Sequence, residues 1–437
     1  MVGAVGMGGL LLLGLAIHGS LLESEGPILY GARRAAEGEL PYRDFILPGM
    51  PYAVYAYVPA GGSLIAARLI SVFLGACTLV TFGCIARPHG WAGVAAVLLL
   101  ATSMSFSAGA VSVAPYPLAL LASSGAYLFA RSGRAFLAGL AAGVAAGSHA
   151  ACLPLVPVLA LWSSLRGEDR RPALHCAAGA VLTLLPCVLL MATAPSMWIA
   201  ELADPVVPSR ARPAQVAENA LQLLLSPQWI TLWILAAVGV ARRRTPEGLA
   251  ALACTLSIGA MAFALAPRSP SILLPALPFL LLTAIPSMDM PVTRPWALAG
   301  LALWGLFLSY RNQEHEAQES RSHSMSPEMV ETVAGALRQH SRPGDTVLAF
   351  WPGYAALAGM RLPPGLESLR AYRAPSTRVP TRETIEQWIR ERRHRVVQIG
   401  RQAQPATEVA HLIAILDSAG YERIFNQWDR YVYRVRE

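Results

Sequence analysis

Long apolar runs separated by short polar connections occupy roughly the first 310 residues of the chain. Each run approaches the ~20 residues that an α-helix needs to cross a bilayer. The runs cover residues 2–22, 62–86, 91–109, 114–130, 135–149, 150–165, 173–194, 226–241, 248–266, 271–288 and 295–310. The pattern predicts a polytopic α-helical membrane protein with about eleven transmembrane helices in residues 1–311.

The composition agrees with this interpretation and excludes an ordinary soluble enzyme. Of 437 residues, 54% are hydrophobic and 14% are charged, whereas soluble domains carry about 25% charged residues. The first apolar run lacks a basic start, and Leu21-Leu22-Glu23 is a poor cleavage site. We therefore expect an uncleaved first helix and not a signal peptide.

Arginines in alternate connections predict the orientation, because cytoplasmic loops of membrane proteins are enriched in basic residues. These connections contain Arg87, Arg131, Arg134, Arg166, Arg170, Arg171, Arg242 to Arg244 and Arg294. The pattern favours a bacterial inner membrane protein with a cytoplasmic N-terminus. Residues 23–61, residues 195–225, the turn at Arg268 and everything after Tyr310 are then extracytoplasmic.

Residues 312–437 have a different pattern, in which amphipathic helices alternate with short apolar strands. Helices are predicted at 326–341, 381–394 and 405–420, and strands at 346–350, 396–400 and through Phe425 and Tyr433. This indicates a separate extracytoplasmic α/β domain. The basic run at 390–395 is interpreted as a solvated helix face near a lipid surface, so no nucleic-acid partner is expected.

The loop behind the first helix, ESEGPILYGARRAAEGELPYRDF at 23–45, is polar in an otherwise apolar region. Pro27 suits the start of a helix and Gly38 suits its end. Apolar side chains fall on one side, so a short helix lying along the membrane surface is predicted. The following PYRDF places Arg43 and Asp44 in a turn after Pro41.

This loop and the helix after it resemble the first external loop and second helix of GT-C superfold glycosyltransferases. That group includes protein O-mannosyltransferases and lipid A aminoarabinose transferases, whose loops read approximately Asp-Glu-Gly, Tyr-Gly-Ala, Glu-Gly and Pro-Tyr-Arg-Asp-Phe. Residues 266–284, APRSPSILLPALPFLLLTA, are similar to the family's Arg followed by a Leu-Pro-x-x-Pro helix. The predicted helix layout also fits that superfold.

The resemblance implies a membrane glycosyltransferase whose donor is a sugar on a polyprenyl phosphate. The lipid tail stays in the bilayer, and the sugar passes to a lipid, glycan or protein acceptor at the external face. A carboxylate then acts as general base, and cationic side chains or a divalent cation stabilise the leaving phosphate. No cofactor is required by the sequence itself, and no residue is assigned as a metal ligand.

Candidate site residues follow from the residues that match the family pattern. Ser24 stands where relatives carry the loop Asp, so Glu25 or Glu23 is assigned the base role. The stretch 111–121, where many relatives carry a second Asp, contains no acid. Contact with the donor phosphate is assigned to His149, which replaces a Lys of relatives, to Arg268 and to Arg43. Structural roles in the loop are assigned to Asp44, Tyr42 and Tyr30.

Each assignment has a simpler structural alternative. Glu23 and Glu25 would favour the start of the loop helix through its dipole, and Arg43 would pair locally with Asp44. Two other classes of function also stay open. A transferase-like scaffold without chemistry is compatible with Ser24, and a lipid-glycan transporter would require ionisable residues within the spans, where Arg68 is almost the only one.

Overall fold

We describe the protein from a computed structural model. It describes residues 1–19, 21, 24–47, 49–166, 171–193, 227–243, 245–265, 270–288, 325–342, 345–367, 380–400, 406–427 and 429–436. The predicted span at 295–310, the predicted loop at 195–225, and the candidates Glu23 and Arg268 lie outside these residues.

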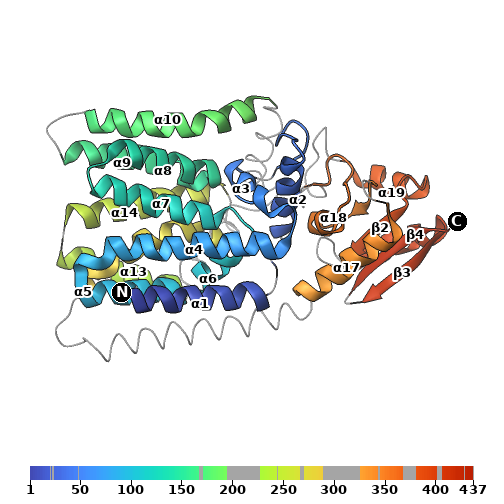
Figure 1. The fold of residues 1–437 in the computed structure, drawn as a ribbon, viewed down its shortest axis with the longest axis horizontal. Coiled ribbons are helices and arrows are strands. Elements are labelled where there is room, and N and C mark those ends of the chain that lie inside the picture. Colours follow the sequence, from blue (N-terminus) through green and yellow to red (C-terminus); the bar gives the residue numbers. More distant parts are fainter. Residues whose placement is uncertain are drawn as a thin grey trace.

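Apolar helices form a bundle in which they run side by side (Figure 1). They match the predicted apolar runs within a few residues. The helices of this bundle are α1 (Val2–His18), α4 (Leu64–Ala86), α5 (Gly90–Thr102), α7 (Tyr116–Arg131), α8 (Ala135–Ser148), α9 (Leu155–Leu165), α10 (Arg171–Ala192), α13 (Pro227–Arg242), α14 (Pro246–Leu265) and α15 (Leu277–Met288).

Two helical segments, Leu64–Thr102 and Arg171–Ala192, are long and apolar enough to cross a membrane. A third is added when Ser105–Val111 and Tyr116–Arg131, which are bent by 112°, count as one broken span. In the other described helices, the apolar stretches are between 10 and 17 residues long. The full set of about eleven spans therefore stays a prediction.

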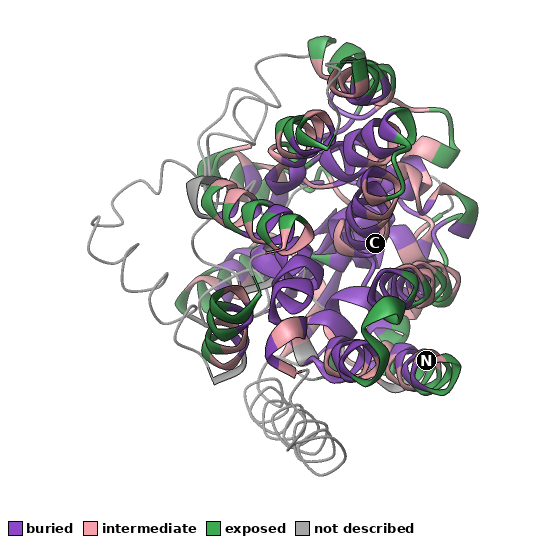
Figure 2. Ribbon diagram, turned by 90° about the vertical axis from the view of Figure 1, so that its left-hand side faces the viewer, coloured by how far each residue is buried: buried purple, intermediate pink, exposed green. Residues whose placement is uncertain are grey.

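Close helix packing in the bundle depends on small residues. A Cβ on Gly139 of α8 would lie 1.9 Å from the carbonyl oxygen of Cys176, and one on Gly179 of α10 would lie 2.3 Å from that of Phe136. Small residues at helix crossings are typical of membrane bundles, where van der Waals contact replaces the hydrophobic effect. Buried residues line the inside of the bundle, and exposed ones face outward (Figure 2).

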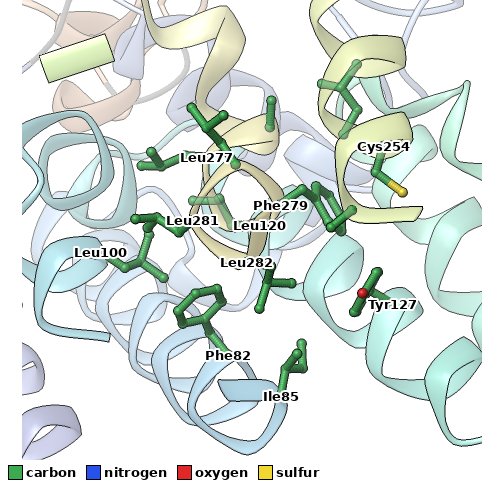
Figure 3. Packing of buried hydrophobic residues seen from close by; sticks show 14 of the residues in the cluster. Phe82, Ile85, Leu100, Leu120, Tyr127, Cys254, Leu277, Phe279, Leu281 and Leu282 are labelled. Atoms are coloured by element: carbon green, nitrogen blue, oxygen red, sulfur yellow. The ribbon is translucent and has the colours of Figure 1, made fainter. Parts of the chain in front are cut away.

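The centre of the bundle is filled by large side chains from several helices (Figure 3). Phe279 of α15 contacts Tyr127 of α7 edge-on, with ring centroids 5.8 Å apart. Tyr127 also stacks on Trp162 of α9 at 5.0 Å. Its hydroxyl donates to the carbonyl of Glu247 at the start of α14, so the polar tip of this ring is satisfied.

The predicted span at 91–109 is wrong in one respect, because the structure divides it at Ser103. There α5 ends, and α6 (Met104–Val111) begins with the Ser103 hydroxyl accepting from the Phe106 N–H. Residues 112–115 then join α6 to α7 without helical structure. Such a break within an apolar bundle needs side chains that satisfy the freed backbone groups.

The loop behind α1 contains α2 (Glu25–Ala36), α3 (Tyr52–Tyr55) and the 3₁₀ turn η1 (Val58–Ala60). A loop helix at this position was predicted, and Gly38 after it has a φ of +90°. Its surroundings differ from the expectation of a surface helix. Most of α2 is buried, because the helix lies between the bundle and the C-terminal part (Figure 1).

The C-terminal part is a small mixed sheet with helices. The sheet order is β1-β2-β4-β3, with β1 parallel to β2 and the other pairs antiparallel. Its elements are α17 (Pro327–His340), β1 (Leu348–Ala349), α18 (Pro352–Ala358), α19 (Arg382–Arg390), β2 (Val396–Gly400), α20 (Ala406–Ser418), β3 (Tyr421–Gln427) and β4 (Arg430–Val435). Every element predicted from the sequence is present, but α18 was not predicted.

An indole ring joins α2 to α18. A Cβ on Gly26 would lie 2.4 Å from Nε1 of Trp351 and 2.8 Å from the backbone nitrogen of Gly353. A Cβ on Gly353 would also lie within 2.6 Å of the same ring. The Trp351 ring therefore fits against two glycines, and no larger residue is compatible with this contact.

We predict that Gly26→Ala weakens the packing of α2 against α18. The added methyl overpacks a contact that includes backbone, so the cost is about 1–3 kcal/mol. Hydrogen exchange in α18 should become faster, and the apparent melting temperature should fall. Gly335→Ala in α17 is the matched control, since a Cβ there meets nothing within 4 Å. Equal behaviour of the two variants would contradict the prediction.

Candidate functional site

A buried ion pair lies where α1, α2 and α4 meet. Glu25, the first residue of α2, is 0% exposed, and Arg68 in the second turn of α4 is 3% exposed. Nη2 of Arg68 lies 2.9 Å from Oε1 of Glu25, and Nε lies 3.2 Å from Oε2. Nη1 of Arg68 donates to the carbonyls of Ala16 and Gly19 at the end of α1. The single charge within the apolar helix α4 is thereby paired and hydrogen-bonded.

The same carboxylate holds the break between α6 and α7. Oε2 of Glu25 accepts from the Val113 N–H at 3.0 Å. The Tyr57 hydroxyl donates to the Ala114 carbonyl at 3.0 Å, and the Ser71 hydroxyl donates to the Ser112 carbonyl at 2.8 Å. Glu25, Tyr57 and Ser71 together replace the helical hydrogen bonds that residues 112–114 lack.

These contacts bear on the base role predicted for Glu25. Each of its oxygens already accepts a hydrogen bond from Arg68, whereas a general base needs a lone pair directed at the proton it removes. The arrangement also does not favour a divalent cation, since the guanidinium of Arg68 already compensates the charge of this carboxylate and would repel a second cation. Among the described residues, no group of three His, Cys, Asp or Glu side chains could hold a metal ion. The base role of Glu25 stays a prediction.

His149 lies at the end of α8, close to the same break. Its Nδ1 accepts from the Ala151 N–H at 3.3 Å, so the neutral ring carries its proton on Nε2. The ring packs against Tyr116, the first residue of α7, with centroids 5.4 Å apart. Residues 112–116 therefore contact Glu25 through Val113 and His149 through Tyr116.

The helix that follows Arg268 reaches this region as well. The 3₁₀ helix η4 (Pro270–Ala276) contacts α6, α7 and the 3₁₀ turn η3 (Ala150–Cys152), which begins directly after His149. A Cβ on Gly109 of α6 would lie 2.1 Å from Leu274 of η4, so this contact is close. Arg268 itself lies outside the described residues, and its approach to Glu25 and His149 stays a prediction.

The other end of α2 is attached to the C-terminal part by arginines. Nη2 of Arg33 donates to the Gly359 carbonyl at 2.9 Å, and Nη1 lies 3.3 Å from the carbonyls of Ala355, Ala356 and Met360. These carbonyls lie at or directly after the end of α18, and those of Ala355 and Ala356 also accept from the N–H groups of Met360 and Gly359. A cation is favourable there, because it also meets the negative end of the helix dipole.

Tyr30 and Arg34 extend this contact on the buried side of α2. The Tyr30 hydroxyl accepts from the Leu362 N–H at 2.9 Å and from Nη1 of Arg34 at 2.8 Å. Arg34 also pairs with Glu39, which is 3.4 Å from Arg361. Burial raises the pKa of Tyr30. The network connects the loop to residues more than 320 positions later in the chain.

The PYRDF turn is closed by Asp44. Its carboxylate accepts from the Leu40 N–H at 2.8 Å and pairs with Arg43 at 2.7 Å. The hydrogen bonds from Arg43 and from the Leu40 N–H lower the pKa of Asp44 to about 2. Tyr42 is buried and has a φ of +65°, a conformation that costs free energy in a residue other than glycine.

This turn forms one wall of a cavity of about 460 Å³. The lining residues are Tyr42, Arg43, Asp44, Phe45, Ile46, Pro364, Gly365 and Glu367. Glu367 is only 3% exposed, and its carboxylate accepts from the Gly365 N–H at 2.7 Å. Burial raises its pKa from the ordinary 4.5 to about 7. Sequence reasoning missed Glu367, since nothing in PPGLES distinguishes this acid from a surface residue.

The structure thus divides the predicted site residues between the two ends of α2. Glu25 and His149 contact residues 112–116 at the first end, whereas Tyr42, Arg43 and Asp44 lie beyond the second. A helix of 12 residues is about 18 Å long. Arg43 is therefore not brought together with Glu25 and His149, and its predicted contact with the donor phosphate has no support from these contacts.

Comparisons with known proteins identify the fold. No protein-family model matches the sequence, and no curated protein matches it. The structure is similar to that of ArnT from Cupriavidus metallidurans bound to undecaprenyl phosphate, with a TM-score of 0.71 and 15% identity over 99% of this chain and 97% of ArnT. It also matches the arabinofuranosyltransferase AftD from Mycobacteria, with a TM-score of 0.43 and 14% identity over 100% of this chain and 40% of AftD.

The match to ArnT over almost the full length of both chains confirms the predicted GT-C fold. The match to AftD is too weak to support an argument. The helical segments that are long and apolar enough to cross a bilayer agree with the predicted membrane protein.

We predict that removing one member of the buried ion pair destabilises the protein. Arg68→Met leaves a buried carboxylate without its cation, which costs about 3–5 kcal/mol. The double variant Glu25→Gln/Arg68→Met should recover much of this loss, since no unpaired charge remains. Thermal melting of the purified protein in detergent measures the effect. A double variant as unstable as Arg68→Met would show that the pair does not act as a unit.

Glu367 should make stability depend on pH. Its pKa is higher in the folded chain than in the unfolded chain, so the folded state binds the proton more tightly. Stability then decreases as the pH rises from about 4.5 to about 7. Glu367→Gln should therefore be more stable than the wild type at pH 8, by up to about 3 kcal/mol, and similar to it below pH 4.5.

Melting temperatures of both proteins at pH 4.5 and pH 8 test this, because other titrating groups cancel in the difference. The exposed Glu328 supplies the control Glu328→Gln. A difference between Glu367→Gln and the wild type that is independent of pH would contradict the prediction.

Proposed function

We propose that the protein is a GT-C glycosyltransferase that moves a sugar from a polyprenyl-phosphate-linked donor to an acceptor at the extracytoplasmic face of the membrane. The observation that carries the proposal is the fold shared with ArnT, whose structure holds undecaprenyl phosphate. The shared fold spans the helical bundle, the loop and the C-terminal part. The acceptor is a lipid, a glycan or a protein.

The distribution of arginines supports the proposed orientation in a bacterial inner membrane. Nη1 of Arg131 at the end of α7 donates to the Ile85 carbonyl at the end of α4, and Nη1 of Arg166 after α9 donates to the Arg131 carbonyl. These ends lie together, away from α2 and the C-terminal part (Figure 1). By the positive-inside rule, the loop and the C-terminal part are then extracytoplasmic. Met1 approaches Gly83 near the arginine end, which supports the proposed cytoplasmic N-terminus.

The proposed reaction occurs at the first end of α2. The acceptor oxygen attacks the anomeric carbon of the donor sugar, and its proton passes to a carboxylate, for which Glu25 and Glu23 are the candidates. The bond between the anomeric carbon and the phosphate oxygen breaks. Nε2–H of His149, together with Arg268, would hold the polyprenyl phosphate that leaves. Glu25 can take the proton only when its ion pair with Arg68 opens.

The ion pair also favours a second candidate function, a transferase-like scaffold without chemistry. Glu25 holds the helix break at 112–114 whether or not a reaction takes place, and Ser24 replaces the acid of relatives. A transporter has less support. A charged path through the bundle would have to include Arg68. In the described part of the chain, Arg68 already pairs with Glu25 and donates to carbonyls at the end of α1.

Transfer of radiolabelled sugar from a panel of polyprenyl-phosphate sugars, by membranes that contain the full chain, tests the proposal. The wild type should transfer label to an extractable acceptor, and His149→Ala should lower the rate by about 10- to 100-fold, the value of a hydrogen bond to a charged group. Glu23→Gln and Glu25→Gln identify the base. Glu328→Gln is the control, since Glu328 is an exposed residue of α17 that lines neither the proposed site nor the cavity.

Loss of transfer in Glu25→Gln alone does not identify Glu25 as the base, because that change also removes a partner of Arg68. Melting of each variant separates the two effects. Absence of transfer with every donor, in a protein that melts normally, would overturn the transferase and favour the scaffold.

A further inference from the structure

The cavity beside the PYRDF turn is separate from the residues that the proposed reaction uses. It lies between the loop and the C-terminal part, beyond the second end of α2. Its volume of about 460 Å³ falls within the range of roughly 300–1,000 Å³ that is usual for small-molecule sites. The cavity brings together residues 42–46 and 364–367, which are more than 300 positions apart in the chain.

The polar groups of the cavity include both hydrogen-bond donors and acceptors. Arg43 and Asp44 at the rim both line the cavity, and they form an ion pair with each other. Glu367 is buried in the wall, with hydrogen bonds from its own backbone N–H and that of Gly365. Among the described residues, no arginine forms an ion pair with Glu367. Phe45, Ile46 and Pro364 make the remaining walls apolar.

This combination excludes several ligand classes. A phosphate or another anion would face the carboxyl groups of Asp44 and Glu367, and a simple ammonium ion would face Arg43. An apolar ligand would cover the carboxyl group of Glu367 without adding to the hydrogen bonds that it accepts from backbone N–H groups. A ligand with several hydroxyl groups fits all of the lining, because each hydroxyl both donates and accepts, and the carbon face of a sugar ring packs on apolar walls.

We propose that this cavity binds a sugar residue of the acceptor. That the sugar belongs to the acceptor rests on the proposed transferase function, whereas sugar binding itself does not. Glu367 and Asp44 accept from sugar hydroxyls, and Arg43 donates to them at the rim. The C-terminal part thereby takes a direct role in substrate binding, about one length of α2 from the reacting carboxylate.

Saturation-transfer NMR on the full chain in lipid nanodiscs tests the proposal, since maltoside detergents would themselves present sugars. The probes are glucose, galactose, mannose, N-acetylglucosamine, maltose and chitobiose, with inorganic phosphate and ethanolamine as charged comparisons. At least one sugar should bind, and both charged probes should not. Glu367→Leu should weaken sugar binding by about tenfold or more, and Glu328→Leu on the surface should have no effect.

A second variant guards against misfolding of Glu367→Leu. Glu367→Gln keeps a donor and an acceptor but cannot ionise, so it should bind the sugar without pH dependence. In the wild type, affinity should rise as the pH passes about 7, because an ionised carboxylate accepts more strongly. The other titratable groups around Glu367 are Tyr30, Arg34, Glu39, Tyr42, Arg43 and Asp44, and they are unchanged in this variant.

Several results would overturn the proposal: no sugar bound by the wild type, binding of phosphate or ethanolamine in place of sugar, or equal binding by the wild type, Glu367→Leu and Glu367→Gln at all pH values. No donor is present in these measurements. Failure here therefore leaves the transferase proposal intact, and sugar binding without any transfer activity removes only the assignment of that sugar to an acceptor.

Discussion

The pairing of Arg68 with Glu25 is the constraint on which the loop, the helix break and the first end of the site depend. An arginine within an apolar helix is costly unless it is paired or used, and in the described part of the chain its partner acid, Glu25, comes from a loop 43 positions earlier. To bring that acid inside, α2 must begin at Glu25 and enter the bundle there. The remaining donors of the guanidinium then close the end of α1, so three helices meet at one charge.

The same carboxylate explains why the chain tolerates a break between α6 and α7. Backbone groups freed at residues 112–114 are buried and need partners, and Glu25, Tyr57 and Ser71 provide them. At the second end of α2 a cation takes the place of the carboxylate, because the guanidinium of Arg33 donates hydrogen bonds to carbonyls at the end of α18. One short helix thus links the bundle to the C-terminal part through its two polar ends.

The sequence predicted most of the helices, because apolar runs of membrane length and the alternation of residues 326–437 depend on local pattern. It did not predict α18, whose short sequence PGYAALA carries no amphipathic period, nor the burial of α2, which depends on Trp351 and Arg33 meeting distant backbone. In the sequence, Arg68 is an isolated charge within an apolar run, which indicates that it needs a partner. Its distance along the chain from each acid does not show that Glu25 is this partner. Glu367 gave no signal, since its burial results from a turn that packs against residues 42–46.

Ser24 stands where the GT-C loop that this sequence resembles has an Asp, and this difference has a geometric consequence that the motif alone does not show. Adjacent residues at a helix start point about 100° apart, and here Ser24 is exposed whereas Glu25 is fully buried. An acid at position 25 therefore points toward Arg68, whereas a side chain at position 24 is exposed. Glu25 cannot substitute for the missing Asp by a small adjustment, because turning it outward would break both hydrogen bonds that it accepts from Arg68. If the proposed chemistry takes place, either opening of the ion pair is part of the reaction or the proton is removed by another group near the start of α2.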